Sequence, residues 1–268
     1  METALKKLVR KNETVLCIDI GNSKAKGAVY KNGMQTRYES QFDPAMARIW
    51  IEELKPAGVI ISSVGGGTEP FIDAANTAAS GKTLRLVVVS SAMALPFAQH
   101  YADGRLGVDR IAGICGAMLA YPGRNCLVMD AGTCLTYDIV TADGQHMGGA
   151  ISPGLQMRLK ALHTFTHCLP LLSPVGNAPL AGLSTEDCIM SGALNGFVFE
   201  AERFIDKFSA MYSNLKTVLT GGGAQVLEQH LEKSYDMRPK LVLEGLLLLY
   251  YWQETYTLAL PEIERTNH

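Results

Sequence analysis

The chain has 268 residues, of which 47% are hydrophobic and 19% are charged, and its formal net charge at pH 7 is −2. This composition is typical of a folded globular protein and excludes a disordered or fibrous chain. The sequence has no stripe of Lys and Arg interleaved with aromatic residues, so we expect no nucleic-acid partner.

The cysteines and the apolar runs favour a cytoplasmic protein without a membrane partner. The six cysteines form no C-x-x-C pair and most lie in apolar runs, which indicates buried free thiols in a reducing compartment. The basic N-terminus is followed by a short apolar segment that Asp19 interrupts, which is not typical of a signal peptide. The longest apolar run, at residues 241–252, contains Glu244 and is too short to span a bilayer.

Buried strands and amphipathic helices alternate in the first half of the chain. Runs of β-branched and aliphatic residues predict strands at 14–20, 26–30, 57–64 and 84–90. Asn32-Gly33 predicts a type I′ hairpin that leads into a further strand. Apolar residues at three- and four-residue spacing predict helices at 44–54 and 110–121, and Pro122-Gly123 ends the second of these.

The second half begins with the same pattern. Strands are predicted at 126–130 and 134–140, and Asp143-Gly144 predicts a hairpin turn after them. A Gly/Pro loop is expected at 148–154 and a helix after it. A Ser/Thr start with acidic residues in the first turn predicts a long helix over 184–211. A further strand is expected to run into the glycine-rich turn that ends at residue 223, with a helix at 224–233.

The repeated order indicates an internal duplication. Asp19 and Gly33 are 14 positions apart, and so are Asp130 and Gly144. Each unit has the order strand, Asp-x-Gly, strand, Asn/Asp-Gly, strand. We therefore expect an N-terminal extension at residues 1–13, a first domain at 14–122 and a second domain at 123–268.

Two Asp-x-Gly turns are candidates for phosphate binding. Glycine lets the backbone approach a ligand closely, and the Asn, Ser and Thr side chains at 22, 23 and 133 offer hydrogen bonds to phosphate oxygens. Phosphates would repel the carboxylates of Asp19 and Asp130 unless a cation lay between them. The pair therefore predicts a metal-assisted phosphate clamp. The alternative is that both aspartates only end strands, as Asp often does at turns.

Asp109-Arg110 follows Gly107 and precedes an apolar helix, so both residues are expected near a helix N-terminus, which favours bound anions. An aspartate there can accept a proton from an attacking hydroxyl. The arginine can pair with a carboxylate or phosphate through two hydrogen bonds. The alternative is an ordinary acidic first turn beside a surface arginine.

Three other patterns are weaker. The glycine turn at 220–225 is not G-x-G-x-x-G, so it does not indicate a dinucleotide fold. His163 and His167 share one helical face, but no third zinc ligand is evident. Gly65–Gly67 does not lead into the Gly-Lys-Ser/Thr of a P-loop.

The order of the motifs resembles type III pantothenate kinase over residues 14–250. The motifs that carry the resemblance are Asp19–Ser23, Gly107–Arg110, Asp130–Thr133, Gly148–Gly154, Thr185 with Ser191-Gly192, and Thr220–Gly222. The resemblance implies the acetate and sugar kinase, Hsp70 and actin superfamily. It therefore implies an α/β protein of two duplicated ribonuclease-H-like domains with an interdomain active-site cleft, the actin-like ATPase fold. It also implies a homodimer.

By the same resemblance, the chain would be a kinase that phosphorylates pantothenate with ATP to 4′-phosphopantothenate, the first step of coenzyme A biosynthesis. Asp109 would be the catalytic proton acceptor. Asp130 would bind a monovalent cation, K⁺ or NH₄⁺, and Mg²⁺ would accompany ATP. The pantothenate pocket would be formed by Tyr101, Gly107, Val108, Asp109, Arg110 and Thr185. The residues expected to bind ATP are Asp19, Ile20, Gly21, Asn22, Ser23, Lys24, Ala25, Lys26 and Thr133.

The sequence departs from the family pattern at Gly65–Gly67, in place of a more usual Val-Pro, and at Gly113, in place of Asn. Two alternatives also remain. One is another phosphotransferase or phosphohydrolase of the same superfamily. The other is a non-catalytic regulatory relative, which would be expected to lack a catalytic or phosphate-loop residue. This chain retains all of them.

Overall fold

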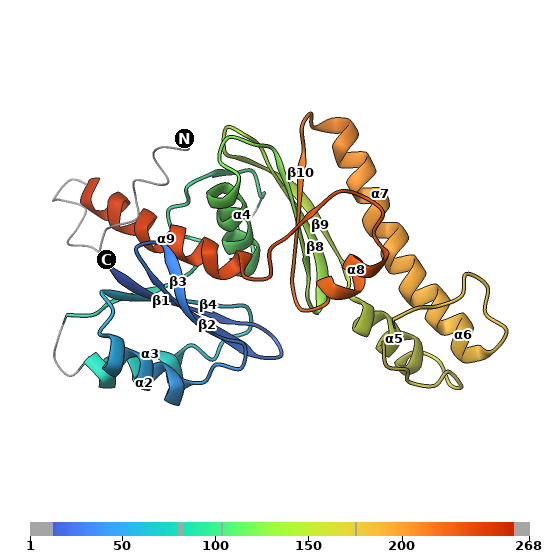
Figure 1. Cartoon of the computed structure of the whole chain (residues 1–268), viewed down its shortest axis with the longest axis horizontal. Coiled ribbons are helices and arrows are strands. Elements are labelled where there is room, and N and C mark those ends of the chain that lie inside the picture. Colours follow the sequence, from blue (N-terminus) through green and yellow to red (C-terminus); the bar gives the residue numbers. More distant parts are fainter. Residues whose placement is uncertain (1–12, 80–82, 103, 175, 260–268) are drawn as a thin grey trace. The chain divides into compact units, whose positions relative to one another are not determined.

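A computed structural model describes residues 13–79, 83–102, 104–174 and 176–259, so residues 1–12 of the predicted N-terminal extension lie outside it. The chain forms two compact units (Figure 1). The first contains the described residues up to Gly123, Gly144–His146 and the residues from Lys240 onward. The second contains Arg124–Asp143 and Met147–Pro239. The domain boundaries predicted from the sequence instead placed all of residues 123–268 in the second domain.

The first unit is built on a five-stranded mixed sheet of order β3-β2-β1-β4-β5. Its strands are β1 (Thr14–Ile20), β2 (Ala25–Lys31), β3 (Met34–Glu39), β4 (Gly58–Ser63) and β5 (Arg85–Val88). The first three form an antiparallel meander, and β4 lies parallel to β1 on one side and to β5 on the other. Asn32 and Gly33 both have positive φ, 54° and 74°, as the predicted type I′ turn requires.

Helices complete the first unit. They are α2 (Pro44–Leu54), α3 (Glu69–Ala79), α4 (Val108–Ala120) and α9 (Leu241–Ala259). Helix α2 begins where expected because Pro44 takes the first helical position and the Asp43 carboxylate accepts a hydrogen bond of 2.7 Å from the Met46 N–H. Side chains of α2 and α3 form one core with β1 and β4.

Two glycines bring α4 and α9 into backbone contact. A Cβ on Gly116 would collide with the Leu241 carbonyl oxygen, and one on Gly245 would collide with the Ala112 carbonyl oxygen. Only glycine therefore permits this close crossing. Helix α9 also contacts β1 and β4, so the last described helix is part of the first unit's core.

The second unit repeats the plan of the first. Its sheet has the order β11-β10-β7-β8-β9, formed by β7 (Cys126–Ala131), β8 (Cys134–Val140), β9 (Gln145–Pro153), β10 (Lys216–Thr220) and β11 (Asp236–Met237). The short strand β6 (Ala98–Gln99) belongs to the first unit, where it pairs with Gln145 and His146 at the start of β9. Strand β7 is antiparallel to β8 and parallel to β10, and β10 is parallel to β11. The order β9-β8-β7-β10-β11 corresponds to β3-β2-β1-β4-β5. The structure thus confirms an α/β fold of two duplicated ribonuclease-H-like units.

The loop predicted at 148–154 is wrong, because strand β9 continues through Gly148 and Gly149 to Pro153. Glycine here reflects close packing within a sheet. A Cβ on Gly149 would collide with the Tyr137 carbonyl oxygen of the neighbouring strand β8. Gly148 has a φ of 93°, a conformation that glycine adopts without strain.

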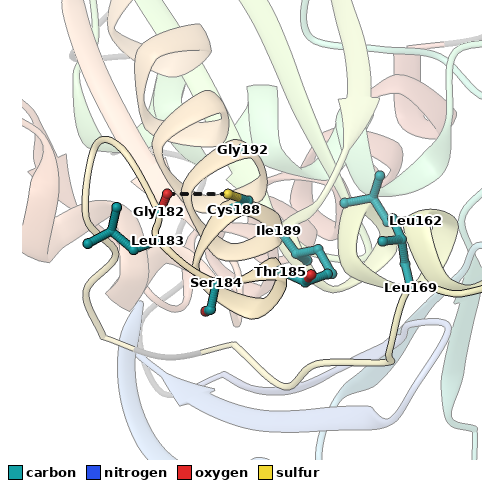
Figure 2. Close-up of a pocket in the computed structure, with 9 residues that line it drawn as sticks. All are labelled: Leu162, Leu169, Gly182, Leu183, Ser184, Thr185, Cys188, Ile189 and Gly192. Atoms are coloured by element: carbon teal, nitrogen blue, oxygen red, sulfur yellow. Dashed lines mark hydrogen bonds between the residues drawn. The ribbon is translucent and has the colours of Figure 1, made fainter.

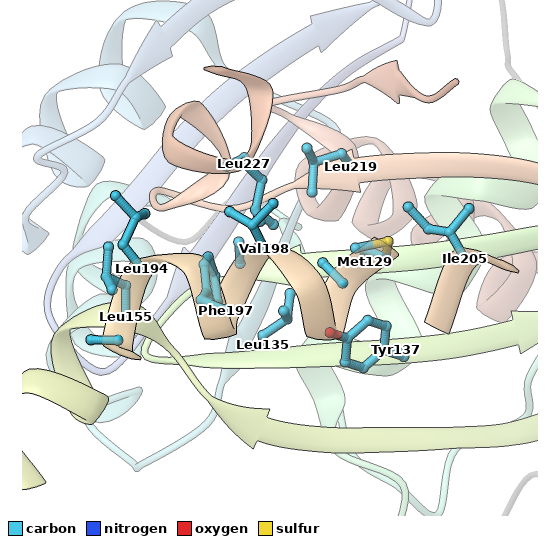
Figure 3. Packing of buried hydrophobic residues seen from close by; sticks show 14 of the residues in the cluster. Met129, Leu135, Tyr137, Leu155, Leu194, Phe197, Val198, Ile205, Leu219 and Leu227 are labelled. Atoms are coloured by element: carbon cyan, nitrogen blue, oxygen red, sulfur yellow. The ribbon is translucent and has the colours of Figure 1, made fainter. Parts of the chain in front are cut away.

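The helices of the second unit are α5 (Leu155–Thr164), α6 (Thr185–Met190), α7 (Gly196–Met211) and α8 (Ala224–His230). The long helix predicted over 184–211 is interrupted by a π-helical turn, η1 (Ser191–Asn195), between α6 and α7. Figure 3 shows how Leu194 of η1 and Phe197 and Val198 of α7 pack with Leu135 and Leu219 of the sheet.

All six cysteines are free thiols. Cys17, Cys115 and Cys126 are buried, as predicted, whereas Cys134 is partly exposed and Cys168 and Cys188 are exposed. Within the described part of the chain, no helix is long and apolar enough to cross a membrane.

Candidate functional site

Asp19 lies one residue before the end of β1. Its neighbour in antiparallel β2 is Lys26, and its neighbour in parallel β4 is Ser62. The buried Ser62 hydroxyl donates a hydrogen bond of 2.9 Å to Asp19 Oδ1. The carboxylate is therefore fixed by the sheet register and by a residue 43 positions later in the chain.

The loop between β1 and β2 turns tightly after Asp19 and Ile20. The Gly21 N–H donates to the Lys24 carbonyl oxygen at 3.1 Å, and residues 21–24 are exposed. Backbone and side-chain donors of Asn22 and Ser23 are thus accessible beside the carboxylate. This part of the predicted phosphate loop forms a compact turn, which ends as Ala25 and Lys26 enter β2.

Burial raises the pKa of Asp19 above its ordinary value. The Ser62 hydroxyl and the positive charge of Lys26 oppose this rise, while the negative charge of Asp109 adds to it. The interaction with Asp109 links the β1 turn to the start of α4 within the same unit. The first unit therefore gathers two of the predicted acidic residues in one electrostatic environment.

The predicted catalytic aspartate lies in the first turn of α4, where the helix dipole favours negative charge. Asp109 Oδ1 accepts a hydrogen bond of 2.8 Å from the Arg110 N–H. A Cβ on Gly107 would lie 2.8 Å from the same oxygen, so the glycine at the N-cap leaves room for the carboxylate. Val108 is the first residue of the helix.

Arg110 is buried and lies beside Tyr101. Its Nη1 donates to the Tyr101 hydroxyl at 3.1 Å, and the guanidinium carbon is 5.4 Å from the centre of the Tyr101 ring. The same ring stacks on His146 at a centroid distance of 6.4 Å. Tyr101 remains 37% exposed, so its ring is accessible while its hydroxyl is held.

Asp130 occupies the equivalent place in the second unit, one residue before the end of β7. Its neighbours are Thr136 in β8 and Thr220 in β10. A Cβ on Gly221, whose φ is 97°, would collide with Asp130 Oδ1 and with the Ala131 carbonyl oxygen. Only glycine at 221 therefore permits the backbone to approach these two oxygens so closely.

The backbone of the turn after β7 is held from both sides. The Gly132 N–H donates to the Cys134 carbonyl oxygen at 2.8 Å, and the Gly154 N–H donates to the Thr133 carbonyl oxygen at 3.1 Å. A Cβ on Gly154 would lie 2.6 Å from the carbonyl oxygens of both Gly132 and Thr133. The Thr133 side chain itself is exposed.

Thr185 lies elsewhere in the second unit, at the start of α6, where Ser184 caps the helix. It lines an open pocket of about 830 Å³ (Figure 2). The lining is largely apolar and comprises Leu162, Leu169, Gly182, Leu183, Ser184, Thr185, Cys188, Ile189 and Gly192. The other predicted pantothenate residues all belong to the first unit.

No group of three or more His, Cys, Asp or Glu residues suited to a metal ion occurs among the described residues. His163 is accounted for locally, because its Nδ1 lies 2.8 Å from the Leu169 carbonyl oxygen. A protein zinc site at His163 and His167 therefore finds no support in this region.

Comparison with protein families identifies the chain. The family model described as type III pantothenate kinase matches residues 15–207. The chain belongs to the type III pantothenate kinase family. This is a family of enzymes, and the resemblance predicted from the order of the motifs is confirmed.

Relatives extend this likeness over nearly the whole chain. A type III pantothenate kinase of Christiangramia forsetii is 37% identical over 90% of this chain and 99% of its own length. One from Flavobacterium johnsoniae is 33% identical over 89% and 98%. A solved structure of a Baf family protein from Campylobacter jejuni, 20% identical, aligns over 90% of this chain and 98% of its own with a TM-score of 0.54, which supports the fold alone.

Two contacts at these turns were not predicted from the sequence. Ser62 bonds Asp19 across parallel strands, and Gly221 makes room beside Asp130. The sequence holds one indication of these contacts, which is a glycine triplet after Ser62 and another after Thr220. Ser62 lies three positions before Gly65–Gly67, and Thr220 lies directly before Gly221–Gly223. That repeat extends the duplication to the fourth strand of each unit.

Proposed function

We propose that this protein transfers the γ-phosphoryl group of ATP to pantothenate, giving 4′-phosphopantothenate in the first step of coenzyme A biosynthesis. The match of the type III pantothenate kinase family to residues 15–207 carries this conclusion. The positions of Asp19, Asp109 and Asp130, each at a strand end or a helix N-terminus, support it.

The two turns would bind ATP. In phosphoryl transfer the protein mainly positions groups and stabilises charge, so accessible donors on glycine-rich turns suit the task. The residues assigned to ATP in the first unit are 19–26, and Thr133 is assigned in the second. The exposure of residues 21–24 and of the Thr133 side chain supports both assignments.

Asp109 would orient the pantothenate hydroxyl and accept its proton. A carboxylate is a weak base, so the proton would move late, as the hydroxyl oxygen bonds to phosphorus. Arg110, held by Tyr101, would present its guanidinium to an anionic group of the substrate. Tyr101, Gly107–Arg110 and Thr185 would together recognise pantothenate, with the protein acting as a homodimer.

The oxygen donors at the second turn suit a hard cation. Carboxylate oxygens such as those of Asp130 are ligands that hard cations prefer. We assign K⁺ or NH₄⁺ to Asp130, as the resemblance to the type III pantothenate kinases implies. When bound, this cation and the Mg²⁺ of ATP would neutralise phosphate charge. The free thiols agree with a cytoplasmic enzyme.

The decisive experiment measures ADP release from purified protein with ATP and Mg²⁺, with and without pantothenate, in potassium and in sodium buffer. We expect release that requires pantothenate and is faster in potassium, with phosphopantothenate found by mass spectrometry. Release without pantothenate would instead indicate a phosphohydrolase. No turnover of ATP under any condition would favour a non-catalytic regulatory relative.

A further inference from the structure

A polar network in the second unit joins α5, α7 and the sheet. Arg158 of α5 donates through Nη2 to Glu200 Oε2 at 2.5 Å, an ion pair in which the side chains are 19% and 25% exposed. The other carboxylate oxygen, Glu200 Oε1, accepts a hydrogen bond of 3.1 Å from the fully buried Tyr137 hydroxyl. Burial, followed by the negative charge of Glu200, raises the pKa of Tyr137, so its hydroxyl stays protonated as the donor.

The same arginine holds the end of strand β9. Arg158 Nη2 also donates to the Ser152 hydroxyl at 2.8 Å, and its Nε donates to the Pro153 carbonyl oxygen at 2.9 Å. One planar guanidinium therefore connects an acidic residue of α7 to two consecutive residues of β9. Lysine, with a single nitrogen, cannot reproduce this geometry.

The end of β9 is in turn bonded to the turn after β7. Gly154 follows Pro153 directly, and its N–H donates to the Thr133 carbonyl oxygen at 3.1 Å. The contact is close along both residues of the turn, because a Cβ on Gly154 would lie 2.6 Å from the Gly132 and Thr133 carbonyl oxygens. A shift of Pro153 would therefore be transmitted to Thr133 without a flexible spacer.

The guanidinium of Arg158 also packs against a buried aromatic ring of α7. Phe197, one helical turn before Glu200 on α7, is 1% exposed, and the Arg158 guanidinium carbon lies 5.5 Å from the centre of its ring. Figure 3 shows Phe197 and Tyr137 within the packed core between α7 and the sheet. Arg158 is thus fixed by a core aromatic ring and a carboxylate together.

We propose that Arg158 and Glu200 are positioning residues for ATP, which hold the Gly132–Thr133 turn in place through Ser152, Pro153 and Gly154. This inference rests on the proposed function to the extent that Thr133 contacts ATP there. Neither residue touches the nucleotide in this scheme. Their loss would loosen the turn that receives the phosphates, while the predicted pantothenate residues of the first unit would keep their contacts.

The test compares the KM for ATP with the KM for pantothenate in Arg158→Ala, well below the melting temperature of the variant. Because small displacements of positioning groups are costly, we expect the KM for ATP to rise about tenfold and kcat to fall, with the KM for pantothenate unchanged. Glu200→Gln should raise the KM for ATP about threefold, and the double variant should be no worse than Arg158→Ala, since the two residues act as one unit. Arg158→Lys should not restore the KM for ATP.

Asp206→Asn is the matched control. Asp206 lies on the same helix α7 and forms an ion pair of 2.8 Å with Lys233. Neither residue is part of the hydrogen-bond network that reaches β9. We expect this change to leave both KM values unaltered. If Arg158→Ala lowers only the melting temperature and leaves both KM values unchanged, the network supports the fold alone and the inference is wrong. Tyr137→Phe provides a milder change should Arg158→Ala fail to fold.

Binding of a non-hydrolysable ATP analogue, measured by calorimetry, separates this inference from the proposed function. Wild-type protein that binds the analogue but does not phosphorylate pantothenate would refute the proposed function. An affinity for the analogue that is about tenfold weaker in Arg158→Ala would still support the positioning role. Equal affinities of the two proteins, or no binding to wild type, would overturn it.

Discussion

Asp19 in the first unit and Asp130 in the second occupy the same place in two equivalent sheets. Each precedes the last residue of the central strand and is followed by a glycine two positions later. Each has a hydroxyl-bearing residue beside it on the parallel strand, Ser62 or Thr220. The duplication therefore extends to the immediate neighbours of the carboxylates.

The surroundings of the two turns differ. The first is bordered by charge, because Lys26 and Asp109 both act on Asp19, and the nearby glycine loop is open. A Cβ on Gly66 would meet nothing within 4 Å. The second is packed backbone against backbone, since Gly154 and Gly221 both lie in close contact with it. The same topological position therefore has a charged, accessible turn in the first unit and a closely packed turn in the second unit.

This difference suggests that the turns of the two units have different roles. A charged, accessible turn suits groups that contact the reacting atoms, whereas close backbone packing suits a rigid binding site for phosphate and cation. The largest predicted effect concerns the second carboxylate near the first turn. Asp109→Asn should lower pantothenate-dependent turnover by a factor on the order of 10²–10⁴, because the proposed proton acceptor is removed while the helix is retained.

The measurement for Asp109→Asn is ADP release, with the melting temperature recorded in parallel. Asp73→Asn changes an exposed carboxylate of the same unit and should have no effect on turnover. Turnover that survives in Asp109→Asn would show that the charged environment of the first turn is not catalytic.

The next effect tests packing. Gly221→Ala should lower the unfolding free energy of the second unit by about 3 kcal/mol, because a positive φ costs an L-residue about 1–2 kcal/mol and overpacking adds a similar amount. Gly66→Ala, with a φ of 91° in open space, should cost the first unit only about 1–2 kcal/mol.

Urea unfolding followed by two probes can separate these glycine variants. Both tryptophans, Trp50 and Trp252, belong to the first unit, so their fluorescence reports that unit, whereas circular dichroism reports both. Equal losses in the two variants would mean that the second turn is not more tightly framed than the first.

A smaller effect concerns the hydrogen bond at the first turn. Ser62→Ala should lower the unfolding free energy at neutral pH by about 1–2 kcal/mol, because a buried carboxylate loses its donor. The pKa of Asp19 should rise further, which carboxyl NMR can follow. Ser63→Ala is the control, since Ser63 donates to the Gly66 carbonyl oxygen and not to a carboxylate. An unchanged pKa of Asp19 in Ser62→Ala would show that the Ser62 hydroxyl does not stabilise the Asp19 carboxylate.

The smallest effect is a gain in stability. Since the folded protein raises the pKa of Asp19, the native state binds the proton more tightly than the unfolded state does. This group therefore favours folding most at acid pH, and that contribution is lost as pH rises through the folded pKa. Asp19→Asn should raise the unfolding free energy at pH 7 and lose this advantage as pH falls below the ordinary carboxyl range. Denaturation at several pH values measures it, and a gain that is independent of pH would contradict it.

Local patterns in the sequence predicted the sheet strands and helix α2 well. Strands 14–20 and 134–140 agree with β1 and β8 at both ends, because each apolar run stops at a turn. Helix α9 was not predicted, since Leu241–Tyr251 is buried nearly all round and lacks the periodicity of a surface helix.

The site was predictable only to the level of its turns. Asp19, Asp109 and Asp130 stand out because carboxylates beside glycines interrupt apolar runs. Their partners do not, because sheet register brings Ser62 to Asp19 from 43 residues away and Glu200 meets Arg158 from 42 residues away. Such pairs depend on which strands and helices become neighbours, which local spacing does not encode.

The crossing of α4 and α9 through Gly116 and Gly245 has a consequence for synthesis on the ribosome. The second unit is formed mainly by one continuous stretch and can fold once Pro239 has emerged. The first unit, although translated earlier, must wait for α9 before α4 has its packing partner. We therefore expect the first unit to complete its folding after the second, and a nascent chain stopped before Leu241 would expose an unfinished first unit to proteases and chaperones.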